Sequence, residues 1–287
     1  MTLGSSPRPV RRVDLHLHTT ASDGWLSPTE VVRRALALGL AAIAITDHDT
    51  TQGVAEALEA ARGTELEVVS GVELSTDTSR TEVHILGYYV SREDAVLREK
   101  LQFLGDSRLR RAQRMMEKLS RMGLPVEWAR VQQLASGASV GRPHVARAMV
   151  EKGYVSSVAG AFDQYIGKRG PAYVERYKLS PTEAVQLILA SQGLPVIAHP
   201  LQVNHLIPEL ARHGLVGLEA YYPGYAPEET RFLLDLAGKH GLVATGGSDF
   251  HGDAGQPANE MGSVNVPLDA LESLRARRAG ARVEVSG

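Results

Sequence analysis

Two histidines and an aspartate lie close together near the start of the chain. In the segment VDLHLHTTASDG, residues 13–24, His16 and His18 come directly after a short apolar run, and Asp23 lies five residues beyond the second histidine. Because alternate side chains of a β-strand point to the same face, His16 and His18 would direct two imidazole rings toward one point. Such a pair is typical of a metal site, but also of histidines that only hydrogen-bond within a core. The other residues of the chain distinguish the two interpretations.

Further residues of metal-binding type stand at or just after other apolar runs. Asp47 and His48 end AIAITDHD, and Glu73 ends VVSGVE. The others are His84 in EVHILGY, His144 in GRPHVA, His199 in VIAHP, and Asp249 with His251 in GGSDFH. Seven of the ten histidines fall in this set, and the other three lie in expected helices. Their regular position at strand ends predicts one shared site.

The number and charge of these side chains favour a site for several metal ions. Carboxylates and imidazoles are costly to bury together unless cations satisfy both. Nine or ten such groups exceed the needs of one ion, and indicate two or three divalent ions that share a bridging carboxylate. The chain has no cysteine, which excludes disulfides and thiolate ligands. The remaining nitrogen and oxygen donors suit manganese, iron(II) or zinc better than copper(I).

Length and charge restrict the class of protein. The 287 residues fit one α/β barrel domain with an insertion, because such barrels commonly have roughly 250 residues. A formal net charge of −2 gives no global positive field for polyanions, so any contact with nucleic acid must be local. The N-terminal MTLGSSPRPVRR lacks the apolar core of a signal peptide, and no apolar run is long enough to span a membrane. We therefore expect a cytoplasmic protein with a flexible tail at residues 1–12.

Short Val/Ile/Leu runs alternate with helical stretches along most of the chain. The expected strands are RRVDLHLH, LAAIAITDHD, LEVVSGVELS, EVHILGYYV, LPVIAHP, LVGLEAYY and LVATGGSDFH. Ser27-Pro28 and Ser180-Pro181 are typical helix N-termini, and Gly39 and Gly241 stand where helices should end. This alternation predicts a parallel sheet closed into a barrel, with the chemistry at the C-terminal ends of the strands.

Residues 91–170 interrupt the alternation. They begin with SREDAVLREKLQFLGDSRLRRAQRMMEKLSRMG, whose Leu and Met spacing predicts a helix, and continue through further short helices. We expect a helical insertion that covers one side of the barrel mouth, while residues 13–90 and 171–287 form the barrel. The arginines of the first helix are interpreted as a solvated face or, alternatively, as a basic wall for a phosphate-bearing substrate. They are Arg98, Arg108, Arg110, Arg111, Arg114 and Arg121.

The chain resembles the PHP (polymerase and histidinol phosphatase) phosphoesterases. The resemblance rests on the ordered motifs DLHLHTTASDG, AITDHDT, GVELS, VHILGY, RPHVARAMV, VIAHP and GGSDFHG, and covers residues 12–270. It is greatest to the branch similar to bacterial 3′,5′-nucleotide bisphosphate phosphatases that also trim RNA or DNA from the 5′ end. It implies a distorted (β/α)7 TIM-like barrel with a small helical insertion and a trinuclear metal site.

The resemblance also implies ligands for three divalent ions, with Mn²⁺ as the leading metal and Fe²⁺ or Zn²⁺ as alternatives. The first ion would be held by His16, His18, Glu73 and Asp249. Glu73 would bridge to a second ion held by His84 and His144. The third would be held by Asp23, His48 and His251, with His199 beside it. Asp47 is expected to orient a histidine through its ring N–H.

Hydrolysis of a phosphate ester needs a nucleophile at neutral pH and a proton for the leaving oxygen. Divalent cations lower the pKa of bound water to about 7 in favourable cases, so a metal-bound hydroxide is the expected nucleophile. Either His199 or a metal-bound water would protonate the leaving sugar oxygen.

Three basic residues are candidates for contacts with substrate phosphates. Arg142 in GRPH is expected to form a guanidinium fork on a phosphate near the ions, or else an ordinary surface ion pair. Lys168 and Arg169 in GKRGPAYV would close on a second phosphate. The tyrosines of YYPGY are interpreted as core packing, with stacking on a base as the alternative.

The predicted function is therefore a metal-dependent phosphoesterase that acts on small phosphorylated nucleotides or short RNA or DNA ends. It would remove the 3′-phosphate of 3′,5′-bisphosphonucleotides and trim oligonucleotides from the 5′ end. We expect no association with a membrane and no obligate protein partner. A histidinol-phosphate phosphatase is an alternative, opposed by the short VHILGY spacing and by Asp23. A non-catalytic metal-binding module is another, opposed by the complete ligand set. No candidate for a carbamylated lysine stands at a strand end, which disfavours amidohydrolase chemistry.

Overall fold

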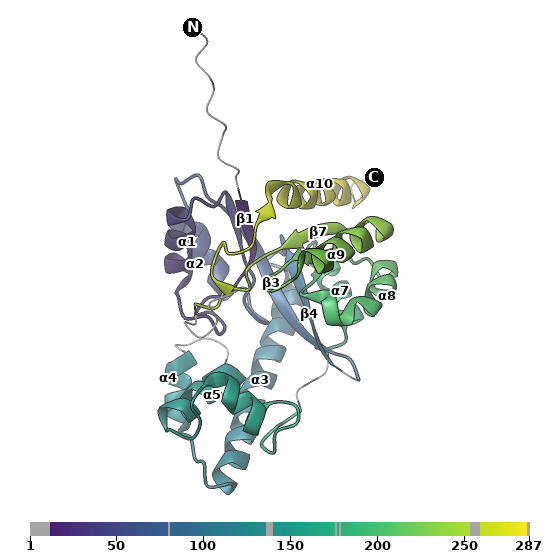
Figure 1. The fold of residues 1–287 in the computed structure, drawn as a ribbon. Helices are drawn as coiled ribbons and strands as arrows, with labels where there is room; N and C mark the ends of the chain where they lie inside the picture. Colours follow the sequence, from purple (N-terminus) through teal and green to yellow (C-terminus); the bar gives the residue numbers. More distant parts are fainter. Residues whose placement is uncertain are drawn as a thin grey trace.

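The chain forms a strand-rich lobe and a helical lobe (Figure 1). The computed structural model describes residues 12–79, 81–135, 140–175, 177, 179–252 and 259–285. The strand-rich lobe is built on one mixed sheet in the order β7-β6-β5-β4-β3-β2-β1-β8. Its strands are β1 (Arg12–Leu17), β2 (Ala42–Ile45), β3 (Glu67–Asp77), β4 (Glu82–Tyr88), β5 (Leu194–Ile197), β6 (Gly217–Tyr221), β7 (Val243–Gly246) and β8 (Val266–Pro267). The expected α/β barrel is confirmed, and each of β1 to β7 coincides with one of the seven predicted runs, although β3 continues two residues beyond its run to Asp77.

The sheet is not parallel throughout, contrary to the prediction. β1, β2 and β3 are parallel to one another, as are β5, β6 and β7. β4 runs antiparallel to both of its neighbours, β3 and β5. The gap between Asp77 and Glu82 is too short for a crossover helix, so β3 and β4 can pair only as a hairpin. The two-residue β8, which pairs antiparallel with β1, was not predicted.

The sheet closes where the segment after β7 meets β1. Leu17 forms a parallel bridge with Phe250, and the His18 N–H donates to the Phe250 carbonyl at 2.9 Å. Gly247 makes this approach possible, because an added Cβ would lie only 2.4 Å from the backbone nitrogen of His16. The absence of a side chain at position 247 therefore brings Asp249 beside the histidines of β1.

A Gly247→Ala substitution should therefore destabilise the fold. We expect a loss of about 1–3 kcal/mol in the free energy of unfolding, because the added methyl group meets backbone that cannot move independently. Urea denaturation of metal-free protein measures this loss. Gly238→Ala is the matched control, since a Cβ there meets nothing within 4 Å and the residue lies inside a helix. Equal stability of the two variants would contradict the packing argument.

The helices of the barrel follow the predicted start and stop signals. They are α1 (Pro28–Ala37), α2 (Gln52–Ala60), α7 (Pro181–Ala190), α8 (Ile207–Arg212), α9 (Pro227–His240) and α10 (Leu268–Val285), with a 3-10 segment at Pro200–Leu206. Ser27 caps α1, since its hydroxyl accepts from the Glu30 N–H at 3.3 Å while the Glu30 carboxylate accepts from the Ser27 N–H at 2.8 Å. Gly241 ends α9 with a φ of 63°. No helix in the described ranges is long and apolar enough to cross a membrane.

The helical lobe, called the cap below, is formed by the helices between Ala95 and Ile166 (Figure 1). These are α3 (Ala95–Arg121), α4 (Trp128–Ala135), α5 (Arg142–Glu151), α6 (Val158–Ala161) and a π-helical turn at Phe162–Ile166. The cap has its own apolar core, which includes Met115 and Leu119 of α3. Leu97 and Leu101 of the same helix belong to the barrel core instead. The bounds 91–170 stay a prediction, and all the cap helices lie within them.

Candidate metal centre

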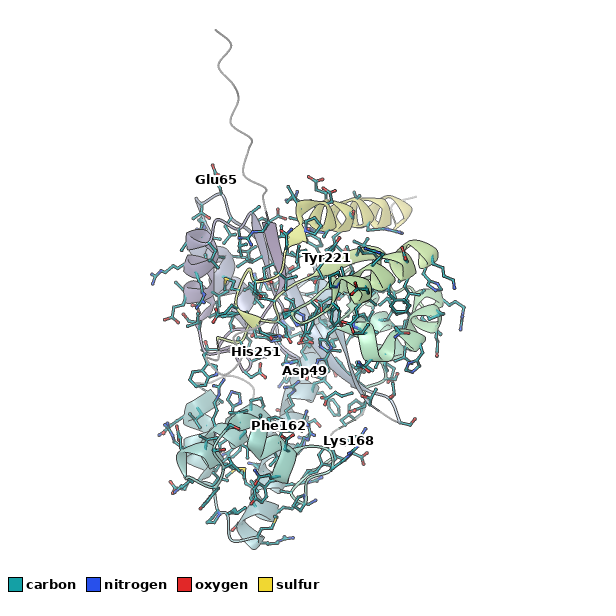
Figure 2. All side chains as sticks on the ribbon, viewed as in Figure 1. Asp49, Glu65, Phe162, Lys168, Tyr221 and His251 are labelled. Carbon is teal, nitrogen blue, oxygen red and sulfur yellow. The ribbon has the colours of Figure 1, made fainter. Side chains whose placement is uncertain are left out.

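The residues of metal-binding type gather at the barrel edge that faces the cap. His16 lies in β1 and His18 directly follows it, while Glu73 and His84 lie in β3 and β4. In Figure 2, the labelled His251 and Asp49 lie at this edge, and Phe162 lies on the cap. Side chains from distant parts of the sequence thus reach one place, because the parallel strands β1, β2 and β3 run toward this edge and the antiparallel β4 begins there.

In each of three overlapping groups of side chains the ligand atoms lie close enough together to hold a metal ion. Within each group the ligand atoms lie within 4.8 Å of one another. The groups are His16, His18, Glu73 and Asp249; His48, Glu73 and His84; and His18, Asp23, His48 and His251. The first group has the same members as the expected first ligand set. The other two differ from expectation, because His48 stands in both and His144 stands in neither.

The buried atoms of this centre have the chemistry that divalent cations require. Buried nitrogen and oxygen atoms without a hydrogen-bond partner are His16 Nε2, His18 Nδ1 and Nε2, both carboxylate oxygens of Glu73, and His84 Nε2. Glu73 Oε2 lies 3.3 Å from His16 Nε2 and 3.2 Å from His18 Nε2, so one carboxylate oxygen faces two imidazole rings. Each unsatisfied buried group costs about 1–3 kcal/mol, and a bound cation would remove that cost. The residues therefore fit a metal centre.

Two histidines of the centre are protonated, and so positively charged, in the metal-free protein. Burial opposes a charge on His18, but the carboxylates of Asp249 and Glu73 outweigh it and raise its pKa to about 10. Burial also opposes a charge on His84, and Glu73 raises the pKa of this residue to about 9. Both histidines therefore carry a proton at pH 7 in the metal-free protein.

Metal binding at pH 7 should accordingly release protons, because a ligating imidazole must be neutral. We expect at least one proton per protein, and a release that shrinks as the pH rises toward about 10, the pKa of His18. Titration calorimetry with Mn²⁺ in two buffers of different ionisation enthalpy measures the release. His213→Gln, which changes an exposed histidine, is the matched control and should release as many protons as wild type. A binding enthalpy that does not depend on the buffer would disprove this assignment of protons.

Glu219 orients His16, and the sequence analysis missed this residue. It lies in β6, fully buried, and both of its carboxylate oxygens are 3.1 Å from His16 Nδ1. It also accepts from the backbone N–H of His199 at 2.9 Å. These contacts fix the His16 ring with Nε2 toward the centre. The only signal in the sequence was a charged residue in the middle of the apolar run LVGLEAYY.

Two further buried carboxylates hold the loops that carry ligands. Asp47 accepts hydrogen bonds from the backbone N–H of Thr19 at 2.8 Å and from the hydroxyl of Ser22 at 2.6 Å. Asp47 thus holds residues 19–22 in place, and its role in orienting a histidine stays a prediction. Asp14 plays the same part for the loop of Asp249, since it accepts from the backbone N–H of Ser248 at 2.8 Å.

His144 and His199 lie beside the three groups. His144 is buried at the start of α5, and its Nδ1 accepts from the backbone N–H of Gly141 at 3.0 Å. Burial lowers the pKa of His144 to about 4, so its ring is neutral at pH 7. Its part as a ligand stays a prediction. His199 places Nε2 3.6 Å from Glu73 Oε1, and its side chain is 30% exposed.

A cavity of about 160 Å³ joins the metal centre to the cap. Its walls are Asp23, His48, Ser75, Glu82 and His84 from the barrel, and Arg108, Arg111, Ala112, Gly141, Arg142, Pro143 and Phe162 from the cap. Arg108 donates from Nε to Asp49 at 2.5 Å and from Nη2 to Ser75 at 2.6 Å. Arg142 donates to both Glu82 oxygens, the nearer at 3.0 Å. Arg108 and Arg111 of α3 and Arg142 of α5 thus line the cavity, and Arg108 and Arg142 are paired there with carboxylates. Their contact with a substrate phosphate stays a prediction.

The other predicted substrate contacts lie outside this cavity. Lys168 and Arg169 are exposed, and neither lines its walls. Their contact with a second phosphate stays a prediction. The Tyr222 hydroxyl donates to Asp249 Oδ2 at 2.8 Å, and the Tyr225 hydroxyl accepts from the Leu201 N–H at 3.3 Å. These two tyrosines therefore support the site's framework.

Comparisons with known proteins agree with this geometry. The PHP domain family matches residues 14–178. The 5′-3′ exoribonuclease Rnm of Escherichia coli is 37% identical over 247 residues, which cover 83% of this chain and 84% of that protein. The 3′,5′-nucleoside bisphosphate phosphatase of Chromobacterium violaceum is 34% identical over 255 residues, or 84% of this chain and 88% of that protein.

A solved structure has the same architecture over nearly its whole length. It is that of a proposed metal-dependent phosphoesterase from Bifidobacterium adolescentis, 30% identical, with a TM-score of 0.86. The alignment covers 94% of this chain and 97% of that one. The family match, the two relatives and this solved structure together show that the chain belongs to the PHP family of metal-dependent phosphoesterases.

Proposed function

We propose that this protein hydrolyses nucleotide phosphate esters. It would release the 3′-phosphate of 3′,5′-bisphosphonucleotides and trim short oligonucleotides from the 5′ end. The observation that carries the proposal is the cavity between ligand side chains of the metal centre and three arginines of the cap. A 3′,5′-bisphosphonucleotide has one phosphate to be cut and a second that needs a cationic partner, and the two sides of the cavity match these needs. The names of the Escherichia coli and Chromobacterium violaceum relatives agree with both activities.

The three groups of ligand atoms would hold three divalent ions, with Mn²⁺ as the leading metal. The donor set contains only imidazole and carboxylate groups, which manganese, iron(II) and zinc accept. When bound, the ions supply Lewis acidity toward the phosphoryl oxygens and lower the pKa of water. Glu73 belongs to two of the groups, so its carboxylate would contribute to holding two of the ions.

His199 is proposed to protonate the leaving sugar oxygen. Its Nε2 lies 3.6 Å from Glu73 Oε1, beside the second group, and 30% of its side chain is exposed. Its backbone adopts a left-handed conformation with a φ of 31°, and the Glu219 carboxylate holds its N–H. A side chain fixed in this way can deliver a proton at a defined place. Arg142, and with it Arg108 and Arg111, would bind the phosphate that is not cut.

Substrate assays of the manganese-loaded protein test the proposal directly. The substrates are 3′,5′-bisphosphoadenosine, a 5′-phosphorylated short RNA and histidinol phosphate, with phosphate release and product mapping as readouts. The His16→Ala, His18→Ala double variant is the control. Turnover of the nucleotides that disappears in the double variant is the expected result. Release from histidinol phosphate alone would move the function to that substrate, and no turnover despite bound metal would favour a non-catalytic module.

A further inference from the structure

An exposed tryptophan lies directly beside the metal centre. Trp25 follows Asp23 by two residues, and half of its surface, 50%, is exposed. An indole of this size is costly to leave in water, and neither the core nor the cavity described above uses it. Its exposure next to a ligand loop therefore indicates a binding role.

The loop that carries Trp25 is held firmly at several points. The Trp25 N–H donates to the carbonyl of His251 at 2.7 Å, and the Thr20 N–H donates to the carbonyl of Leu26 at 2.9 Å. Gly24 packs against the backbone of His18, where an added Cβ would lie only 2.7 Å from the carbonyl oxygen. These contacts hold the backbone at Trp25 in one position relative to the ligands.

A cation lies against one face of this ring. The guanidinium carbon of Arg147 lies 4.3 Å from the centroid of the Trp25 ring. The Nη2 of Arg147 donates to the backbone carbonyl of Asp23 at 2.8 Å, which ties the stack to the ligand loop. An aromatic ring paired with a fixed arginine combines a stacking surface with attraction for phosphate.

Trp25 and the arginine cavity are separate surfaces that meet at Asp23. The Asp23 side chain lines the cavity, whereas its backbone carbonyl contacts Arg147. Neither Trp25 nor Arg147 lines the cavity. A nucleic-acid chain whose first nucleotide occupied the cavity would therefore have Trp25 within reach on the other side of Asp23.

We propose that Trp25, backed by Arg147, stacks on the base that follows the scissile phosphate of an oligonucleotide substrate. This inference rests on the proposed function, and it predicts that only one of the two proposed substrates contacts Trp25. A bisphosphonucleotide has no base beyond the phosphate that is cut, so it would not use the platform. An RNA chain would use it, because a base stacks on an aromatic side chain with little regard to sequence.

Trp25→Ala should therefore separate the two activities. We expect kcat/KM for a 5′-phosphorylated tetraribonucleotide to fall about tenfold, as loss of one stacked base predicts, while that for 3′,5′-bisphosphoadenosine changes by less than about twofold. Trp25→Phe, which keeps an aromatic face, should restore most of the oligonucleotide activity. Phe232→Ala is the matched control, because it removes another exposed aromatic ring, 46% exposed, from α9.

Direct binding provides a second readout. In a Trp128→Phe background Trp25 is the only indole of the chain, and a stacked base should quench its fluorescence. Equal losses on both substrates, or no loss on either, would overturn the platform. If wild-type protein cleaves 3′,5′-bisphosphoadenosine but the oligonucleotide leaves the fluorescence unchanged, the platform fails and the proposed phosphatase function stands. If wild-type protein cleaves neither substrate, the proposed function itself fails.

Discussion

Glu73→Gln is expected to reduce phosphoester turnover by about 10³-fold or more. Glu73 is the carboxylate shared by two of the three ligand groups, and its oxygens lie within 3.3 Å of His16 and His18 and 2.8 Å from His84. Glutamine keeps the size of the side chain but removes the negative charge that two cations would share. Turnover of 3′,5′-bisphosphoadenosine and the metal content per protein are the measurements, and both should fall together.

The matched control for this experiment lies on the same strand. Glu67 stands at the start of β3 and forms a surface ion pair with Arg275, far along the strand from the ligands. Glu67→Gln should leave turnover within about twofold, since surface ion pairs contribute roughly 0–1 kcal/mol. A Glu73→Gln protein with full metal content and turnover within tenfold of wild type would refute the bridging role.

Glu219→Gln should lower metal affinity by about 10–100-fold, as is typical when a residue that orients a ligand is changed. The amide keeps the shape, but it cannot stabilise the proton on His16 Nδ1 as a carboxylate does. The buried Glu219 and Asp249 charges outweigh the burial of His16 and hold its pKa above the usual range. Competition with a chelator of known affinity measures the loss, and excess Mn²⁺ should restore most of the turnover.

A purely structural role would give a different pattern for Glu219→Gln. In that case the free energy of unfolding would fall while turnover at saturating metal and metal affinity stayed unchanged. Glu209→Gln offers a comparison on the neighbouring α8, where the carboxylate lies at the surface and touches no ligand. It should match wild type in chelator competition.

The strands and most of the side chains that meet in the three groups could be predicted because their signals are local. Runs of Val, Ile and Leu followed by His, Asp or Glu mark strand ends, and the alternation in DLHLH alone puts His16 and His18 on one face. Helix caps such as Ser27 with Glu30 are equally local. These features depend on residues a few positions apart, which a single sequence contains in full.

The features that were missed depend on which distant segments meet. The direction of β4 follows from the hairpin with β3, and the membership of His48 in two ligand groups follows from how β2 and β3 pair. Glu219 resembles an ordinary member of an apolar run until the fold places it against His16. Arg108 resembles a solvated helix residue until the same fold brings it to Asp49.

The division of α3 between two cores has a consequence for how the protein unfolds. Leu97 and Leu101 are buried among barrel residues, whereas Met115 and Leu119 are buried among cap residues. Deletion of the whole cap would therefore remove part of the barrel core, and unfolding of α3 would destabilise the sheet. The two lobes should therefore unfold in a single cooperative transition. A design that replaces the cap with another domain would have to keep the first turns of α3, which complete the barrel core, and join the new domain after them.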